Sequence, residues 1–221
     1  MPQVDSRFAY PGWAGPFVTY SDVGTAVSAD YDYVIFDVET TGFDPAQGDR
    51  MLEVCAIRAN GRGEVLGSFS SLLNAGVDDV GAEHIHGISL AMLQDAPTFG
   101  EVFDQIVPLM QDAIFVAHHA KFDESFIAAE AALAGIALTQ MPGLCTYWLA
   151  RQTVQETDNH KLATLAQHFN LDTGTAHSAA DDAFVVVQML PTLLQRIPGI
   201  HLTTPLSQQL HHGKYAQALT R

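Results

Sequence analysis

The chain has 221 residues, 48% of them hydrophobic, which is enough for one domain with a real core and excludes a disordered or fibrous protein. Lys and Arg number 10 against 25 Asp and Glu, for a net charge of −15. Because nucleic-acid binders gain most of their affinity from basic residues that contact phosphates, this balance argues against a large nucleic-acid footprint.

The chain shows no sign of membrane insertion or export. No apolar run approaches the length of a membrane helix. Residues 1–30 carry one basic residue, Arg7, with no compact apolar segment after it, so we expect no signal peptide. Cys55 and Cys145 have no metal-type spacing and are interpreted as reduced thiols. We therefore expect a soluble cytoplasmic protein without a membrane partner.

The first half of the chain predicts an aromatic extension followed by strands. Residues 1–32 are rich in Gly and Pro and carry spaced aromatic residues, so we expect them to pack on the domain. Tyr33–Val38 is predicted to be a buried strand, followed by the polar loop Glu39–Gly42. Met51–Asn60 and Glu64–Leu73 are two further strands, and the Asn-Gly pair between them is a hairpin signal. The aromatic residues of the extension are Phe8, Tyr10, Trp13, Phe17 and Tyr20.

The second half is mostly helical. Ser89 and Thr98 are candidate N-caps, and apolar residues from Phe99 to Met110 recur at helical spacing. Ala113–Ala117 is another buried strand. The remaining predicted helices are Lys121–Ala134 (ended by Gly135), Leu144–Gln152, Lys161–Phe169, Ser178–Gln195 and a short one after Thr204-Pro205 in the tail. Strands mixed with helices of these lengths predict an α/β sheet covered by helices on both faces.

Acidic residues stand where three of these elements begin or end. Asp37 and Glu39 are two positions apart at the end of the first strand, so both point to the same face. Asp123 and Asp182 lie in the first turns of two helices, and His177 precedes Asp182 by five positions.

Together these residues favour a metal site. Four converging carboxylates repel one another unless hard divalent cations such as Mg²⁺ or Mn²⁺ neutralise them. Two such ions clamp the oxygens of a phosphoryl displacement, and a nearby histidine can accept a proton from water. Taken singly, each residue has a plainer reading: an Asp at a helix start is more often a cap, and acids at a strand end are often only solvated.

Three segments resemble the exonuclease motifs of the DEDDh 3′–5′ exonucleases, the DnaQ-like group of the DNA polymerase III epsilon subunit, ribonuclease T and exonuclease X. They are FDVETTG (Phe36–Gly42), VAHHAKFDESFI (Val116–Ile127) and HSAADDA (His177–Ala183). EHIHGIS (Glu83–Ser89) is similar to the family's HGI segment, and the resemblance covers Tyr33 to Leu194. It implies a ribonuclease H-like fold: a five-stranded mixed sheet, its second strand antiparallel to the rest, flanked by helices on both faces.

The resemblance also implies roles for the five residues of the motifs. Asp37, Glu39 and Asp182 would hold two divalent ions, with Asp37 bridging them. Asp123 would support the second ion, either directly or through a water molecule. His177 would be the general base.

Substrate contacts are the second implication. Thr40 and Thr41 would approach the terminal nucleotide, and His86 would lie near its base or sugar. Two positions depart from the family pattern: His119 stands where Asn is usual, and Cys145 where Asp commonly precedes Thr. The first departure concerns nucleotide contacts, and the second is interpreted as structural.

The function that follows is a metal-dependent 3′–5′ exonuclease that releases nucleoside 5′-monophosphates. Since Lys121, Arg151 and Lys161 are the few cations near the motifs, we expect a short or single-stranded substrate held at its 3′ end. A metal pair of His118 and His119 is a weaker alternative, because adjacent side chains point apart.

Two further alternatives concern the chain as a whole. It could be a proofreading-type subunit or processing module of a polymerase or repair complex, or an inactive relative, which the intact acids oppose. The predicted division is an extension over 1–32, an exonuclease domain over 33–195 and a tail over 196–221. Both extensions could dock a partner or merely cap the domain.

Overall fold

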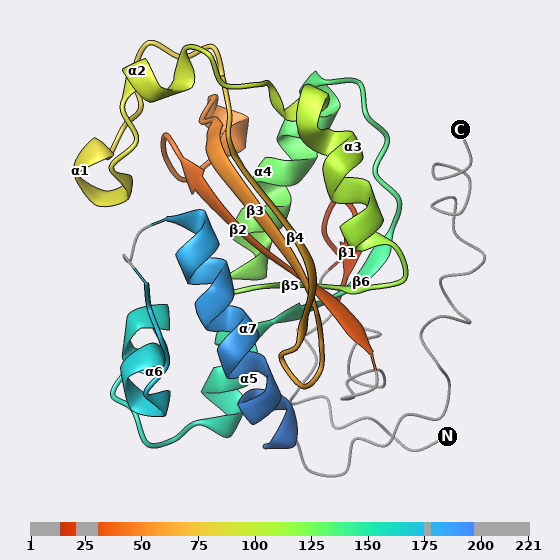
Figure 1. Ribbon diagram of the computed structural model, residues 1–221, viewed down its shortest axis with the longest axis vertical. Coiled ribbons are helices and arrows are strands. Elements are labelled where there is room, and N and C mark those ends of the chain that lie inside the picture. The colour runs from red at the N-terminus through yellow and green to blue at the C-terminus, as the bar shows by residue number, and fades with distance from the viewer. Residues whose placement is uncertain (1–13, 21–30, 175–177, 197–221) are drawn as a thin grey trace.

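The fold is built on one six-stranded sheet with the strand order β1-β6-β5-β2-β3-β4 (Figure 1). It is seen in a computed structural model that describes residues 14–20, 31–174 and 178–196. Strands β1, β6, β5 and β2 run parallel, and β3 is antiparallel to both of its neighbours. The strands are β1 Val18–Thr19, β2 Asp32–Thr40, β3 Met51–Asn60, β4 Val65–Leu72, β5 Ile114–Ala117 and β6 Met141–Cys145.

The predicted mixed sheet is confirmed, with one strand more than expected. Strands β2 to β6 form the five-stranded sheet, and the second of them, β3, is antiparallel to the rest. The sixth strand comes from the N-terminal segment, where Val18 and Thr19 pair with Met141 and Pro142 of β6. A two-residue strand carries no periodicity, so the sequence does not reveal it.

Helices cover both faces of this sheet. Helices α3 and α4 pack on one face, and α5, α6 and α7 pack on the other (Figure 1). The short helices α1 and α2 lie beyond one end of the sheet, near the loop that follows β2 (Figure 1). The helices are α1 Glu83–His86, α2 Leu90–Leu93, α3 Phe99–Met110, α4 Ala120–Leu133, α5 Thr146–Thr153, α6 Leu162–Phe169 and α7 Ala179–Gln195, with a 3₁₀ turn, η2, at Pro45–Gln47.

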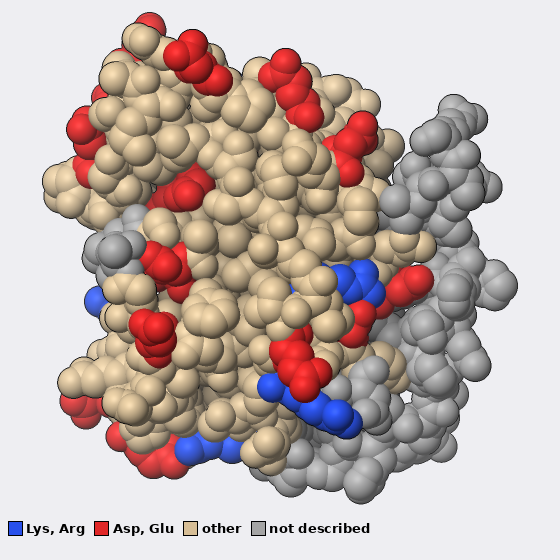
Figure 2. Space-filling view, viewed as in Figure 1, with Lys and Arg blue, Asp and Glu red and all other residues tan. Residues whose placement is uncertain are grey.

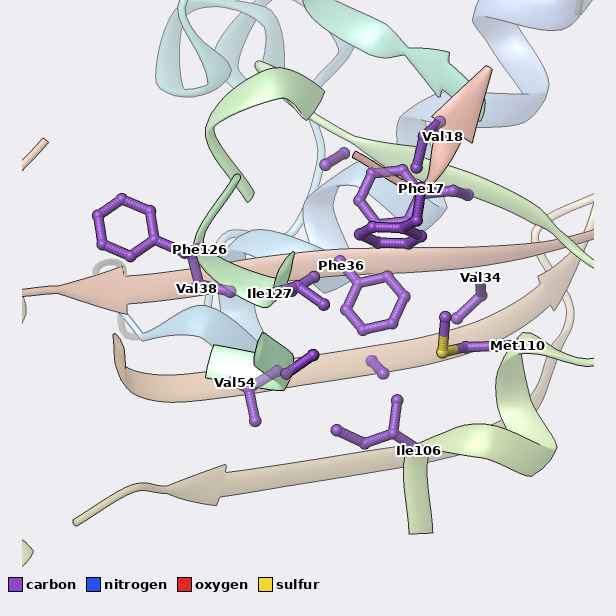
Figure 3. Close-up of a cluster of buried hydrophobic side chains, with 14 of the residues drawn as sticks. Phe17, Val18, Val34, Phe36, Val38, Val54, Ile106, Met110, Phe126 and Ile127 are labelled. Atoms are coloured by element: carbon purple, nitrogen blue, oxygen red, sulfur yellow. The ribbon is translucent and has the colours of Figure 1, made fainter. Parts of the chain in front are cut away.

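Alternation along β2 divides its side chains between the two layers. Val34, Phe36 and Val38 join the core under α3 and α4 (Figure 3). In this core the ring of Phe36 stacks on that of Phe115, with centroids 5.1 Å apart. Tyr33 and Ile35 join the core under α5, α6 and α7. Since side chains alternate along a strand, the next odd-numbered residues of β2 also face α7.

The prediction of a helix over Leu144–Gln152 is wrong at its start. Leu144 and Cys145 belong to strand β6, and α5 begins at Thr146. Pro142 and Gly143 hide this strand, because both residues are unusual in a strand. The glycine is required here, since a Cβ at Gly143 would overlap the side chain of Val18.

The predicted hairpin joins β3 and β4, although its positive φ falls at Gly63 and not at the Asn-Gly pair. The side-chain oxygen of Asn60 accepts hydrogen bonds from the backbone N–H groups of Arg62 and Glu64, at 3.0 and 3.1 Å. Gly63, at φ +82°, donates its N–H to the carbonyl of Asn60.

The described part of the N-terminal extension packs on the domain. Phe17, Val18 and Tyr20 are buried, and the N–H of Met141 donates to the carbonyl of Phe17 at 2.8 Å. The other aromatic residues of the extension (Phe8, Tyr10 and Trp13) and the helix predicted after Thr204-Pro205 lie outside the described residues. The boundaries of the three predicted regions stay a prediction. None of the described helices is both long and apolar enough to cross a membrane.

Candidate active site

Two carboxylates stand at the carboxyl end of β2. Asp37 and Glu39 follow Tyr33 and Ile35 in the alternation and therefore face α7. The pairing register of β2 with β3 shifts directly after Glu39, so the regular ladder ends at this residue. The end of a strand in an α/β sheet is where functional groups become accessible.

Helix α7 brings a third carboxylate to the same place. Asp182 lies in its first turn, and Ser178 caps the helix by accepting the N–H of Asp181 at 3.2 Å. The N–H of Ala179 donates to Oε2 of Glu53 on β3 at 3.1 Å. The start of α7 is thus tied to the sheet beside β2.

The three carboxylates form one cluster. Asp37, Glu39 and Asp182 each offer an oxygen, and these oxygens lie within 4.8 Å of one another. All three residues are partly exposed, so the cluster is open to a ligand. Oxygen ligands at this spacing suit a hard divalent cation.

The electrostatics of the cluster favour a cation as well. Burial raises the pKa of Asp37 well above its ordinary value, and the charges of Asp123, Asp182 and Glu39 raise it further. Burial, followed by the charges of Asp182 and Glu53, raises the pKa of Glu39 to about 7. Asp37 and Glu39 therefore resist ionisation beside the other carboxylates, and a divalent ion would remove that repulsion.

Asp123 borders this cluster from α4. Its side chain is 3% exposed, and burial raises its pKa, against the effect of backbone hydrogen bonds that include one from Val38. Its Oδ2 is buried without a hydrogen-bond partner among the described residues. A buried carboxylate oxygen rarely lacks a partner, so this one fits a bound cation or a water held by one. Asp123 is not part of the 4.8 Å cluster, as expected for a more distant ligand.

The other residues implied by the family resemblance are placed less directly. His177 lies outside the described residues and directly precedes Ser178 in the chain. Thr40 donates its hydroxyl to the carbonyl of Gly42 at 2.7 Å. The hydroxyl of Thr41 accepts the N–H of Arg50 at 3.0 Å. Both threonine side chains thus shape the loop after β2, and their contact with a nucleotide stays a prediction.

His86 is buried and holds the segment around α1. Its Nε2 lies 3.1 Å from the carbonyl oxygen of Val80, and its Nδ1 accepts the N–H of Ile88 at 3.0 Å. Burial raises the pKa of Glu53 and the nearby His86 opposes that rise, so the ring lies close to this carboxyl. The predicted role near the base or sugar would use the edge of the ring, since both nitrogens are engaged.

The alternative metal pair of His118 and His119 gains no support from the described residues. Both ring nitrogens of His118 are within hydrogen-bond distance of protein oxygens, and burial lowers its pKa to about 4. His119 stacks on Tyr147. Cys145 is buried at the end of β6, and burial raises the pKa of its thiol, as suits a structural position.

Sequence reasoning missed Glu53. It pairs with Glu39 across β2 and β3 and accepts the N–H of Ala179, so it joins two elements of the site. Its pKa is raised, by burial first. In the sequence, Glu53 is a single acidic residue within the apolar strand Met51–Asn60. Its place beside the site follows only from the pairing register of β2 with β3.

Comparison with known proteins finds exonuclease relatives. The model of the RNase T exonuclease family matches residues 34–190. The PolC-type DNA polymerase III of Bacillus cereus is 35% identical over 191 residues, which is 84% of this chain and 13% of the polymerase. The 3′-5′ exonuclease DinG of Bacillus subtilis is 30% identical over 166 residues, 75% of this chain and 18% of that protein. This chain thus spans less than a fifth of the length of either relative.

A solved structure shares the fold. The nuclease domain of 3′hExo, a DEDDh family member bound to rAMP, superposes with a TM-score of 0.66 at 15% identity. The match covers 81% of this chain and all of that domain.

Proposed function

This chain belongs to the RNase T exonuclease family, and from that premise we propose that it is a metal-dependent 3′–5′ exonuclease. It would hydrolyse phosphodiester bonds at the 3′ end of single-stranded or short nucleic acid and release nucleoside 5′-monophosphates. The observation that carries the proposal is the cluster of Asp37, Glu39 and Asp182, with their oxygens within 4.8 Å. The rAMP bound to the similar 3′hExo domain supports a nucleoside monophosphate as product.

The residues present fit two divalent ions, Mg²⁺ or Mn²⁺. Asp37, Glu39 and Asp182 would hold them, and the unpartnered Oδ2 of Asp123 would support the second. When bound, such ions stabilise the charge that develops on the phosphate during displacement. The protein's own part is to keep four carboxylates fixed at the ends of β2, α4 and α7, so that no reorganisation is needed during the reaction.

Proton transfer and positioning fall to neighbouring residues. His177 would accept the proton of the attacking water, the task that its spacing from Asp182 implies in this family. The loop of Thr40 and Thr41, braced by Arg50, would hold the terminal nucleotide next to the carboxylates. His86 would border the same nucleotide.

A second candidate is work within a larger assembly. Related domains occupy only 13% of a PolC-type polymerase and 18% of DinG, so this fold also serves as a module of longer proteins. A polymerase or repair partner would supply affinity for DNA that a chain of net charge −15 lacks. Gel filtration combined with activity of the isolated protein distinguishes an independent enzyme from a dependent module.

We also propose that the protein acts in the cytoplasm. A cytoplasmic site of action agrees with Cys55 and Cys145, which are free, buried thiols.

The decisive experiment pairs metal binding with hydrolysis. Asp37→Ala and Asp182→Asn are expected to lose Mn²⁺ affinity in calorimetric titration and to lose hydrolysis across a panel of single- and double-stranded DNA and RNA. Asp104→Ala removes an exposed acid from α3 and should change neither property. If Asp37→Ala kept near-wild-type activity with Mg²⁺, the two-metal proposal would be wrong.

A further inference from the structure

Three segments that are distant in sequence meet at the carboxyl ends of β5 and β6. His118, after β5, joins them: its Nδ1 lies 3.1 Å from Oγ1 of Thr146 and its Nε2 2.9 Å from the carbonyl oxygen of His160. Thr146 begins α5, and His160 immediately precedes the residue that caps α6. Because one partly buried ring contacts both neighbours, the surface that these segments share is a fixed part of the fold.

Flat rings and a cation cover this surface. The ring of His119 stacks on that of Tyr147, with centroids 3.9 Å apart and planes inclined by 26°. The guanidinium of Arg151 lies 5.9 Å from the centroid of the Tyr147 ring and 5.4 Å from that of Trp148. His119 and Arg151 are exposed, whereas Tyr147 and Trp148 are half-buried and support them.

The backbone explains why a histidine can stand at position 119. His119 has φ +75°, in the left-handed region that Asn, Asp and His enter more readily than other side chains. Asn is the usual residue here in the resembling family. His119 satisfies the same backbone and adds a ring that Asn does not offer.

The rings lie close to the candidate metal site. Strands β2, β5 and β6 run parallel, with Ile35 in register with Val116 and Ala117 with Cys145. Their carboxyl ends therefore share one edge of the sheet. Tyr147 follows two residues after Cys145, two strands away from the carboxylates of β2, which corresponds to roughly 10 Å at about 4.8 Å per strand.

Each of the same three segments also carries a basic residue. Lys121, Arg151 and Lys161 are all exposed, on α4, on α5 and at the start of α6. On the face of the molecule that Figure 2 shows, acidic side chains are widely spread.

We propose that His119, Tyr147 and Arg151 form a subsite for a nucleotide upstream of the 3′-terminal one. A base stacks on the exposed ring of His119, and Arg151, with Lys121 and Lys161, neutralises the adjoining phosphates. Aromatic rings beside cations are the usual means of binding a single strand without sequence preference. The subsite rests on the proposed function and identifies its substrate as a flexible single strand of at least two nucleotides.

The test compares substrates with and without an upstream nucleotide. The p-nitrophenyl ester of thymidine 5′-monophosphate has none, whereas an oligothymidylate of about eight nucleotides has several. His119→Asn keeps the left-handed backbone and removes the ring. It is expected to lower kcat/KM about 10-fold more for the oligonucleotide than for the ester, within the range of one lost base stack.

A measurement of oligonucleotide binding tests the subsite independently of catalysis. Fluorescence anisotropy of a 5′-labelled oligothymidylate should give a slope of log affinity against log salt of about −2 for three phosphate contacts. Arg151→Gln should make this slope shallower by about 0.7. The control Arg62→Gln, in the β3–β4 hairpin, removes an equal charge outside the patch and should leave the slope as it is.

The outcomes separate the subsite from the exonuclease proposal. Equal losses on both substrates, or none on either, would show that His119 does not bind a base and would overturn the subsite. A wild-type protein that cleaves neither substrate with Mg²⁺ or Mn²⁺ would overturn the proposed function. In that case the anisotropy of the His119→Asn and Arg151→Gln variants still decides whether the patch binds a single strand.

Discussion

The carboxylate of Glu124 accepts a 2.7 Å hydrogen bond from the backbone N–H of Val18, a residue 106 positions earlier in the chain. The same oxygen accepts the N–H of Phe17 at 2.9 Å. Glu124 is fully buried and directly follows Asp123 on α4. The family match begins at residue 34, so this N-terminal segment lies outside it and is anchored beside a candidate metal ligand.

Glu124→Ala should therefore destabilise the protein. The substitution leaves two buried backbone N–H groups without an acceptor, and we expect the free energy of unfolding to fall by about 2–5 kcal/mol. Urea unfolding followed by circular dichroism measures the loss. Asp104→Ala, which removes an exposed acid, should stay within about 0.5 kcal/mol of wild type. Equal stability of the two variants would mean that the segment contributes nothing through Glu124.

The stability of the metal-free protein should depend on pH through the acidic cluster. The pKa of Glu39 rises from its ordinary value of 4.5 to about 7 on folding, and those of Asp37 and Asp123 are raised as well. Between about pH 4.5 and 7 the folded state thus binds more protons than the unfolded state, so the free energy of unfolding falls as pH rises through this window.

Thermal unfolding in a chelator, compared with millimolar Mn²⁺, tests this dependence. Mn²⁺ should remove the decline, and Glu39→Gln should reduce it in the chelator. Burial lowers the pKa of His118 to about 4 on folding, which favours its neutral form. The contribution of His118 to the free energy of unfolding therefore rises with pH, opposite to that of the carboxyl groups. The comparison of Glu39→Gln with wild type cancels that contribution. A decline that is the same in both proteins would contradict the assignment to Glu39.

His177→Ala should slow hydrolysis by about 10²–10⁴-fold, the usual effect of losing a positioned base. Mn²⁺ affinity should largely survive, since His177 is proposed to contact water and not the metal. In the wild type, kcat/KM should rise with pH through the histidine range and then level off. A profile that is flat from about pH 5 to 8, with chemistry shown to limit the rate, would exclude this role.

The sequence predicts those parts of the site that depend on residues close to one another in the chain. Asp37 and Glu39 share a face because a strand alternates, and the apolar run Tyr33–Val38 makes that strand evident. Asp123 and Asp182 lie in the first turns of two helices that the sequence predicts. The observed cluster brings Asp37, Glu39 and Asp182 together as this local pattern implies.

The parts that the sequence conceals depend on distant contacts. Strand β1 has two residues, and it exists because Gly143 leaves room for Val18. Glu124 looks like any helical acid until the N-terminal segment is placed against it. Glu53 gains meaning only through its register with Glu39. Each of these is a pairing between segments, and periodicity within one segment does not encode such pairings.

Two glycines allow the loop after β2 to be tested with a matched control. Gly81 and Gly76 both have positive φ, at +73° and +65°. A Cβ at Gly81 would overlap the carbonyl oxygen of Thr41, whereas a Cβ at Gly76 would meet nothing within 4 Å. The two substitutions to alanine thus share the backbone cost of about 1–2 kcal/mol, and only one of them displaces Thr41.

Gly81→Ala should therefore lower kcat/KM on a short single strand about 10-fold or more, because a displacement near 1 Å at a positioning group can cost up to about 10² in rate. Gly76→Ala should lose stability alone and keep kcat/KM. Steady-state kinetics well below both melting temperatures, with Mn²⁺ affinity measured in parallel, isolates the effect on the loop. If the two variants lost the same activity, strain in the 76–81 segment would account for both, and the close approach of Gly81 to Thr41 would have no part in holding the nucleotide.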